Sequence, residues 1–339
     1  MNRLPPAATD DRSEALPASE CLIVAAATPV TAEFRPDIEM LAAHCRWLLD
    51  AGCDGIALFG TTGEGPVFSA DDRKAGLEAM LSAGIPARRL IVSTTALAQA
   101  DVVSLASHAL DAGVDSILLM PPCVYRAHVT EEGAYRFYAS IIERLGRDDT
   151  RLCLYHFPDI CGVPLTPRVI RRLDEGFPGI ITGVKDSGGD FGFTETLVRS
   201  FSHLGVYTGS ETHVPQALAL GARGTICGLG NVMPRLMRAM FDTPTTFDRR
   251  AMIPLITSGD FILSRQSFGA SIKAVLAGAT GQHEWNRMVP PINELPQPER
   301  SWVVRDFALW ERSLPPAMRS LWLDQAANET KVVPLRRIS

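Results

Sequence analysis

The stretch "LIVSTTALAQADVVSLASHALDAGVDSILLM", residues 90–120, contains two short apolar runs separated by an amphipathic helical segment. The runs "LIVSTT" and "SILLM" are apolar throughout and do not alternate with polar residues, which is typical of parallel strands covered on both faces. The segment from Ala100 has helical spacing and ends at Gly113, a residue type that commonly follows the last turn of a helix. The stretch therefore predicts one strand–helix–strand unit.

The same alternation recurs along most of the chain. Eight runs suited to buried strands follow one another at fairly regular spacing: "CLIVAAA" from 21, "GIALF" from 55, "LIVSTT" from 90, "SILLM" from 116, "LCLYHF" from 152, "IITGVK" from 180, "GVYTG" from 205 and "GTICGL" from 224. Eight such units joined by right-handed crossovers predict an α/β fold of the (β/α)8 TIM-barrel type. A doubly wound open sheet is the alternative, but the loop after the first run, "AATPVTAEF" at 26–34, lacks the glycines that such folds use.

The chain divides into three predicted parts. Residues 1–19 are rich in Pro, Ala and charge without periodicity and are predicted to be a flexible leader. Residues 20–245 are predicted to form the barrel. Residues 246–339 are predicted to form a C-terminal helical region and tail, with helical patterns in "RRAMIPLITSGDFILSR" and "SIKAVLAGATG" and no assignment after about 296.

Helix start signals agree with this division. Ser69 and Asp72 have capping-box spacing, and Thr166 precedes a proline placed to open a helix.

Composition excludes several classes of partner. The 339 residues carry a formal charge of −5 without a basic stripe, so we expect no nucleic-acid partner. The apolar run near the start is too short to span a bilayer and lacks the basic flank of a signal peptide, so we expect no membrane partner and a cytoplasmic protein. The seven cysteines form no CxxC pair, which predicts reduced and mostly structural thiols.

Lys185 ends the sixth apolar run, "GIITGVKDSGGD" at 179–190, where an unpaired ammonium is costly. Barrel enzymes carry reactive groups at the carboxyl ends of their strands, and a partly neutral amine there can form a Schiff base with a ketone. Strand alternation places Gly183 on the same face, which predicts room for a ligand beside the lysine. The alternative is a structural lysine paired with Asp186 or with another carboxylate at the barrel rim. A second lysine in an apolar stretch, Lys273, lies in a segment with helical spacing and is the competing candidate for the nucleophile.

Two further groups are predicted at the same barrel end. Tyr155 ends the fifth run and offers a phenol that can give and take protons. The loop "GTTGEGP", residues 60–66, offers backbone amides for a carboxylate and the hydroxyls of Thr61 and Thr62. The structural alternatives are a barrel tyrosine with a bonded hydroxyl and an ordinary tight turn.

With these motifs the sequence resembles the Schiff-base pyruvate lyases that include N-acetylneuraminate lyase and dihydrodipicolinate synthase. The resemblance runs from about Cys21 to about Gly281 and is carried by "GTTGEGPVFS", "PPCVYRAHVTEEG", "YHFPDICGVPL", "GVKDSGGD" and "GARGTICGLGNVMP". It implies a lyase without a cofactor or metal, acting on a small 2-oxo acid with a pyruvate moiety, and a homotetramer or homodimer. It also implies the site residues: Lys185 as the imine lysine, Tyr155 as the proton shuttle, Thr61 and Thr62 as the carboxylate site, and Gly209 and Ile226 as pocket-lining positions. Because their two hydroxyls stand in a glycine-flanked loop at a strand end, we also expect Thr61 and Thr62 to take part in proton relay, with Thr62 as a catalytic residue.

Two departures narrow the expected substrate. Dihydrodipicolinate synthases carry an arginine for a second carboxylate five residues after the shuttle tyrosine, and Ile160 stands there. A second family tyrosine aligns with Val124, and Tyr125 is adjacent. We therefore expect an aldolase or dehydratase of a 2-oxo-3-deoxy sugar acid, with dihydrodipicolinate synthesis or deamination or cleavage of a related cyclic imine acid as the alternative.

Other classes remain open from the sequence. The glycines of "GARGTICGLGN", residues 221–231, suit a phosphate-binding barrel isomerase. A ligand-sensing barrel without turnover is a further alternative. The seven histidines show no metal-binding spacing, and His156, next to Tyr155, is expected to face away from the barrel interior as a packed, hydrogen-bonded residue.

Overall fold

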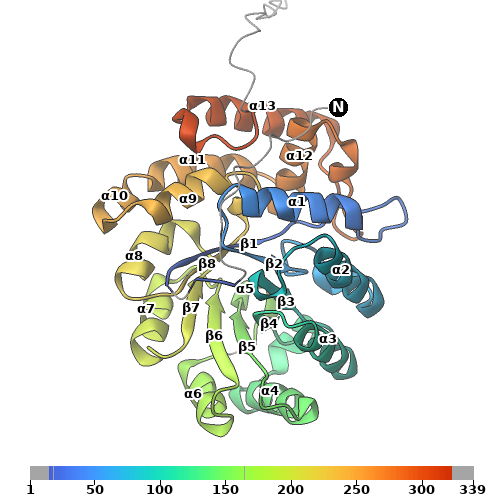
Figure 1. The fold of residues 1–339 in the computed structure, drawn as a ribbon, viewed down its shortest axis with the longest axis vertical. Helices are drawn as coiled ribbons and strands as arrows, with labels where there is room; N and C mark the ends of the chain where they lie inside the picture. The colour runs from blue at the N-terminus through green and yellow to red at the C-terminus, as the bar shows by residue number, and fades with distance from the viewer. Residues whose placement is uncertain (1–14, 18, 164, 323–339) are drawn as a thin grey trace, which may run out of the picture.

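A computed structural model describes residues 15–17, 19–163 and 165–322. Its eight strands form a closed barrel in chain order, and every neighbouring pair is parallel (Figure 1). The strands are β1 (Cys21–Ala25), β2 (Gly55–Leu58), β3 (Leu90–Ser93), β4 (Ser116–Leu119), β5 (Leu152–His156), β6 (Ile181–Asp186), β7 (Gly205–Thr208) and β8 (Gly224–Cys227). Each coincides with one of the eight predicted runs, and β6 extends one residue beyond its run, to Asp186. The (β/α)8 prediction is confirmed, and the doubly wound alternative is wrong because the sheet closes.

Helices alternate with the strands and cover the barrel from outside (Figure 1). They are α1 (Ile38–Asp50), α2 (Ala70–Ser82), α3 (Gln99–Asp111), α4 (Glu131–Leu145), the short α5 (Pro158–Cys161), α6 (Pro167–Gly176), α7 (Phe191–Ser200) and α8 (Val214–Ala219). Because side chains cover both faces of the sheet, all residues of β1 to β4 are buried, as their continuous apolar runs predict.

The predicted helix signals lie where the helices begin and end. Ser69 caps α2 by accepting from the backbone of Asp72, and Thr166 caps α6 ahead of Pro167. Gly146 ends α4 with a left-handed backbone that other residue types adopt less readily.

Within the described residues five α-helices follow β8; in Figure 1 they lie across the top and upper left of the barrel, with α12 and α13 above α1. They are α9 (Pro234–Asp242), α10 (Thr246–Arg250), α11 (Ile253–Ser264), α12 (Phe268–Thr280) and α13 (Gln297–Ser313). Helix α13 occupies part of the tail that the sequence leaves unassigned. Most of the predicted leader, and the tail from residue 323, lie outside the described residues. None of the described helices has the length and apolar composition needed to cross a bilayer.

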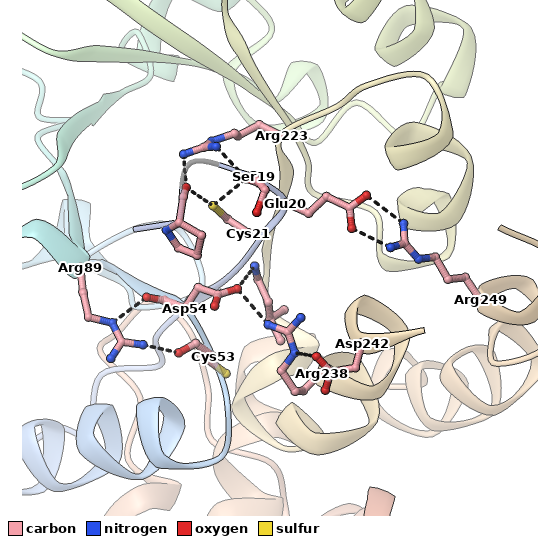
Figure 2. A network of polar contacts seen from close by, with 12 residues as sticks. Ser19, Glu20, Cys21, Cys53, Asp54, Arg89, Arg223, Arg238, Asp242 and Arg249 are labelled. Atoms are coloured by element: carbon pink, nitrogen blue, oxygen red, sulfur yellow. Dashed lines mark hydrogen bonds and ion pairs between the residues drawn. The ribbon is translucent and has the colours of Figure 1, made fainter. Parts of the chain in front are cut away.

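Arginines hold together the amino ends of the strands, opposite the end where the sequence predicts the site. Figure 2 shows Arg249 forming an ion pair with Glu20 before β1, and Arg223 donating to the carbonyl of Ser19 at 2.6 Å. Asp54, before β2, accepts from the backbone of Leu22 and pairs with Arg238 of α9 at 3.0 Å. These contacts fix where β1 enters the barrel, which is a stabilising role expected of this end of the fold.

All seven cysteines are free, and six of them are buried, with Cys123 exposed. Burial raises the pKa of Cys45 to about 12, so this thiol stays protonated and packs as a small apolar group.

Candidate active site

The carboxyl ends of the strands open into a cavity of about 360 Å³. All six predicted site residues line it: Thr61, Thr62, Tyr155, Lys185, Gly209 and Ile226. They come from the ends of β5, β6 and β8 and from the loops after β2 and β7. The closed barrel thus brings together residues separated by up to 165 positions in the sequence.

Lys185 and Tyr155 are register partners on the adjacent strands β5 and β6. The Nζ atom of Lys185 lies 4.3 Å from the centre of the Tyr155 ring. The hydroxyls of Tyr155 and Thr61 form a hydrogen bond of 3.1 Å. Amine, phenol and threonine hydroxyl therefore form one connected group on the cavity wall, in which a proton on the phenol has a neighbour for transfer.

The loop Gly60–Pro66 turns sharply after β2 to present the two threonines. The amide of Gly65 donates to the carbonyl of Gly60 at 3.0 Å, and the amide of Glu64 donates to the carbonyl of Thr61 at 3.2 Å. A Cβ atom at position 65 would lie 1.7 Å from the carbonyl oxygen of Phe59, so only glycine fits there. Close packing against Phe59 therefore explains why the predicted motif has a glycine at position 65.

Asp186 is not the partner of Lys185. Its carboxylate accepts from His156 at 2.8 Å, from the hydroxyl of Thr194 at 2.6 Å and from the amide of Gly188 at 2.9 Å. Burial raises the pKa of Asp186, but these three hydrogen bonds outweigh burial and hold it below its usual value. The alternative of a lysine paired with Asp186 is therefore wrong, and no described carboxylate forms an ion pair with Lys185.

His156 faces away from the cavity, as the strand alternation predicts. It is absent from the cavity wall, and its ring packs against Phe193 with the ring centres 4.3 Å apart. The prediction of a packed, hydrogen-bonded histidine is confirmed by this contact and by the bond to Asp186.

Gly183 does not leave room beside the lysine, so that prediction is wrong. The register of β5 with β6 shifts between Leu152 and Cys153, and a Cβ atom at position 183 would lie 2.4 Å from the carbonyl oxygen of Gly205. The ring of Tyr207 fills the remaining space at 3.4 Å. The glycine permits two strands to approach closely and does not form part of the cavity wall.

The structure locates the two departures from the family pattern. Ile160 lies on α5 and lines the cavity, so an apolar side chain stands where an arginine would bind a second carboxylate. Val124 is exposed on the turn Cys123–His128, outside the cavity wall. The side chain of Tyr125 lies outside what the structure describes.

Several cavity residues escape the sequence analysis. Glu211 follows Gly209 by two positions, and Ser187 follows Lys185 by two; a polar residue just beyond a predicted strand end is the signal for both. Apart from Ile160, which the sequence comparison with the family already singles out, the other lining residues come from loops and from the C-terminal region, where no strand marks them: Glu64, Phe157, Gly228, Ser267, Phe268, Gly269, Met288 and Ile292.

The backbone amides that a phosphate would need already donate hydrogen bonds to Glu211. The amides of Gly228 and Leu229, just after β8, donate to its Oε1 atom at 3.1 and 3.0 Å. A phosphate bound there would compete with a carboxylate of the protein itself and would be repelled by it. The prediction of a phosphate site in residues 221–231 is therefore wrong.

Burial raises the pKa of Glu211 from 4.5 to about 7, although the two amides oppose the shift. Its neutral form can then donate a hydrogen bond near neutral pH.

We expect Glu211→Gln to gain stability relative to the parent as pH rises from 5 to 8. A carboxyl whose pKa is raised on folding favours the folded state below its unfolded pKa, and this contribution is lost as pH rises through about 7. The shift sets an upper limit on the order of 3 kcal/mol. Thermal unfolding across this pH range checks the prediction, with the surface variant Glu195→Gln as control. A difference in Tm between Glu211→Gln and the parent that does not change with pH would contradict it.

Within the described residues no three or more His, Cys, Asp or Glu side chains gather in a way that could hold a metal ion.

Comparisons with known proteins agree with this architecture. The family model of the dihydrodipicolinate synthetase family matches residues 18–251. An uncharacterized DapA-like lyase of Chloroflexus aurantiacus is 37% identical over 222 residues, covering 65% of this chain and 73% of that protein. A 4-hydroxy-tetrahydrodipicolinate synthase of Corynebacterium diphtheriae is 31% identical over 223 residues, covering 65% of this chain and 70% of that protein.

Among solved structures, the dihydrodipicolinate synthase of Agrobacterium tumefaciens superposes with a TM-score of 0.79 at 29% identity, covering 86% of this chain and 99% of that chain. The family model spans more than half of the chain and includes both β5 and β6, which carry Tyr155 and Lys185. These matches confirm the resemblance on which the sequence predicts an enzyme of the Schiff-base lyase class. The chain belongs to the dihydrodipicolinate synthetase family.

Proposed function

We propose that this protein is an aldolase or dehydratase that acts on a 2-oxo-3-deoxy sugar acid through a Schiff base on Lys185. The observation that carries the proposal is the amine of Lys185 next to the ring of Tyr155, whose hydroxyl is bonded to Thr61 on the wall of one cavity. The barrel supplies nucleophile, proton shuttle and carboxylate site together.

The chemistry begins when the neutral amine of Lys185 attacks the C2 ketone. The C2–O bond breaks, the oxygen leaves as water with a proton from Tyr155, and a protonated imine remains. In cleavage, Tyr155 accepts the proton of the C4 hydroxyl, the C3–C4 bond breaks toward the imine, and an aldehyde leaves an enamine behind. Protonation of the enamine at C3 and addition of water release pyruvate and restore the amine.

Dehydration shares the first step. Tyr155 then accepts a proton from C3 to give the enamine, and the C4 hydroxyl leaves as water after protonation. Thr61 and Thr62 bind the C1 carboxylate in both cases and take part in the proton relay, which Thr61 joins through its hydrogen bond to Tyr155.

The far end of the cavity supports a hydroxylated substrate. Among the described residues that line the cavity, Lys185 carries the sole cationic side chain. A second carboxylate would therefore lack a cation and would face Glu211 and the apolar side chain of Ile160. The carboxyl of Glu211 and the hydroxyls of Ser187 and Ser267 suit sugar hydroxyls, which both donate and accept hydrogen bonds.

We propose a homotetramer or homodimer in the cytoplasm. The family resemblance supports the assembly. The free, mostly buried cysteines support a reducing compartment.

A turnover screen of 2-oxo acids tests the proposed substrate class. We expect 2-oxo-3-deoxy sugar acids to be consumed, with pyruvate released if the C3–C4 bond is cleaved and no pyruvate released if water is lost. Pyruvate with aspartate semialdehyde serves as the competing reaction. Efficient condensation of that pair, with sugar acids left unchanged, would contradict the proposal and favour dihydrodipicolinate synthesis.

Thr62→Val is expected to lower turnover by about 10-fold or more with a Tm close to that of the parent. Thr62 lines the cavity on a loop whose fold depends on backbone hydrogen bonds, so loss of its hydroxyl should affect the site more than the fold. Steady-state kinetics with a thermal scan checks this, and Thr196→Val, at an exposed position of α7, is the control. A strongly lowered Tm combined with normal activity of the folded fraction would instead favour a structural role.

A further inference from the structure

A buried ion pair joins the loop Gly60–Pro66 to the C-terminal helix α12. The Nζ atom of Lys273 contacts Oε1 of Glu64, and the two residues are 1% and 5% exposed. Lys273 also donates to the carbonyl of Arg287 at 2.8 Å, and the amide of Val289 donates to Oε2 of Glu64 at 2.8 Å. Both charges are thus paired and further hydrogen-bonded, which a buried ion pair needs in order to persist.

This pair lies beside the proposed carboxylate site. Glu64 is two positions after Thr62, and all three residues Thr61, Thr62 and Glu64 line the cavity. The backbone of Glu64 has a left-handed φ of 55°, and its amide closes the turn onto Thr61. A side chain anchored at this residue therefore holds the strained part of the loop that presents the threonines.

Lys273, the other residue of the pair, lies on α12, and the start of this helix also lines the cavity. Ser267, Phe268 and Gly269, at the start of α12, line the cavity as well. The same helix carries Lys273 one to two turns later. The contact therefore connects the carboxylate loop with a second segment of the chain that lines the cavity.

The ion pair also neutralises the charge of Glu64, which lies close to the proposed carboxylate site. An unpaired carboxylate of Glu64 would repel a substrate carboxylate bound at Thr61 and Thr62, and low local polarity would strengthen the repulsion. Burial lowers the pKa of Lys273, while Glu64 opposes the shift. Lys273 is not itself part of the cavity wall, so it acts through Glu64.

We propose that Lys273 is a positioning residue that acts through Glu64: it cancels the negative charge of Glu64 beside the carboxylate loop, so that the site accepts an anionic 2-oxo acid. This proposal rests on the proposed function, because it assumes that the carboxylate of the substrate binds at Thr61 and Thr62.

The test compares an anionic ketone with a neutral one. Borohydride trapping at a series of concentrations gives half-saturation values for pyruvate and for methyl pyruvate, whose ester carries no charge. For Lys273→Met we expect the pyruvate value to rise by about 10-fold or more, because one buried carboxylate is left unpaired. The methyl pyruvate value is expected to change by less than about 3-fold, since charge repulsion affects only the anion.

The double variant Glu64→Gln/Lys273→Met removes both charges and is expected to recover most of the pyruvate affinity. Arg199→Met, which breaks an exposed ion pair with Glu195, is the control and should change neither value. Equal losses for the two ketones in Lys273→Met, or no recovery in the double variant, would overturn the proposal.

A failure of Lys273→Met to fold leaves the proposal testable through Glu64→Gln. This variant removes the negative charge, so the preference for pyruvate over methyl pyruvate should stay at or above that of the parent. A fall in that preference would overturn the proposal. If the parent protein traps neither ketone on Lys185, the proposed function itself fails; if it traps both and the variants do not separate them, only the role of the pair fails.

Discussion

Lys185→Ala is expected to lower turnover by about 10³-fold or more while the protein remains folded. The substitution removes the nucleophile, so the covalent route through the imine is lost. Stability should equal or exceed that of the parent, because the change deletes a buried amine that no described carboxylate pairs with. Steady-state kinetics and thermal unfolding of the same preparation check both parts.

Lys185→Arg separates nucleophile from charge. A guanidinium stays protonated and cannot form the imine, so this variant should be as inactive as Lys185→Ala. Lys74→Ala, on exposed α2, is the control and should keep full activity. Substantial activity in either variant at position 185 would show that the amine is not the nucleophile.

Tyr155→Phe is expected to lower turnover by about 10²- to 10⁴-fold, the usual range for loss of a general acid–base group. The substitution keeps the ring that lies 4.3 Å from the amine and removes only the hydroxyl bonded to Thr61. Pyruvate should therefore still be trapped on the enzyme by borohydride, but more slowly. Single-turnover trapping and steady-state kinetics measured together distinguish slowed proton transfer from lost binding.

Tyr135→Phe is the matched control for this change. Tyr135 lies on α4 against the guanidinium of Arg172 and away from the cavity wall, so its hydroxyl should be dispensable for turnover. An unchanged rate in Tyr155→Phe would contradict the role of the phenol as the proton shuttle.

The barrel could be predicted because each strand is encoded locally. A parallel strand covered on both faces is apolar throughout, so "LIVSTT" and "SILLM" identify β3 and β4 without knowledge of their partners. Helix α13 lacks such a signal. Its fully buried residues are Val303, Phe307 and the charged Glu311, whereas the apolar Trp302 and Leu309 are exposed, so apolar character alone does not mark its buried face.

Glu311 shows why a charge in that stripe could not be interpreted from the sequence. It is buried and accepts hydrogen bonds from the amides of Ser320, Leu321 and Trp322, which return along the helix. Such compensation depends on where the following segment goes, and local periodicity does not contain that information.

Part of the candidate site could likewise be predicted from local sequence, and part depends on how distant segments pack. Lys185, Tyr155 and the threonine loop stand at strand ends, so chain position together with the barrel rule predicts that they meet. The pairing of Glu64 with Lys273 joins positions 209 residues apart and depends on how α12 packs on the barrel. The error at Gly183 arose because strand alternation does not show what lies next to a glycine, and here the carbonyl of Gly205 and the ring of Tyr207 occupy that space.

Borohydride trapping with pyruvate, followed by peptide mass spectrometry, tests the Schiff base most directly. The account predicts reduced pyruvate on the peptide that contains "GVKDSGGD", at Lys185, and on no other lysine. Lys273 should stay unlabelled because its amine is bonded to Glu64 and to the carbonyl of Arg287 outside the cavity wall. Label on Lys273, or no label on Lys185 in active enzyme, would contradict the mechanism.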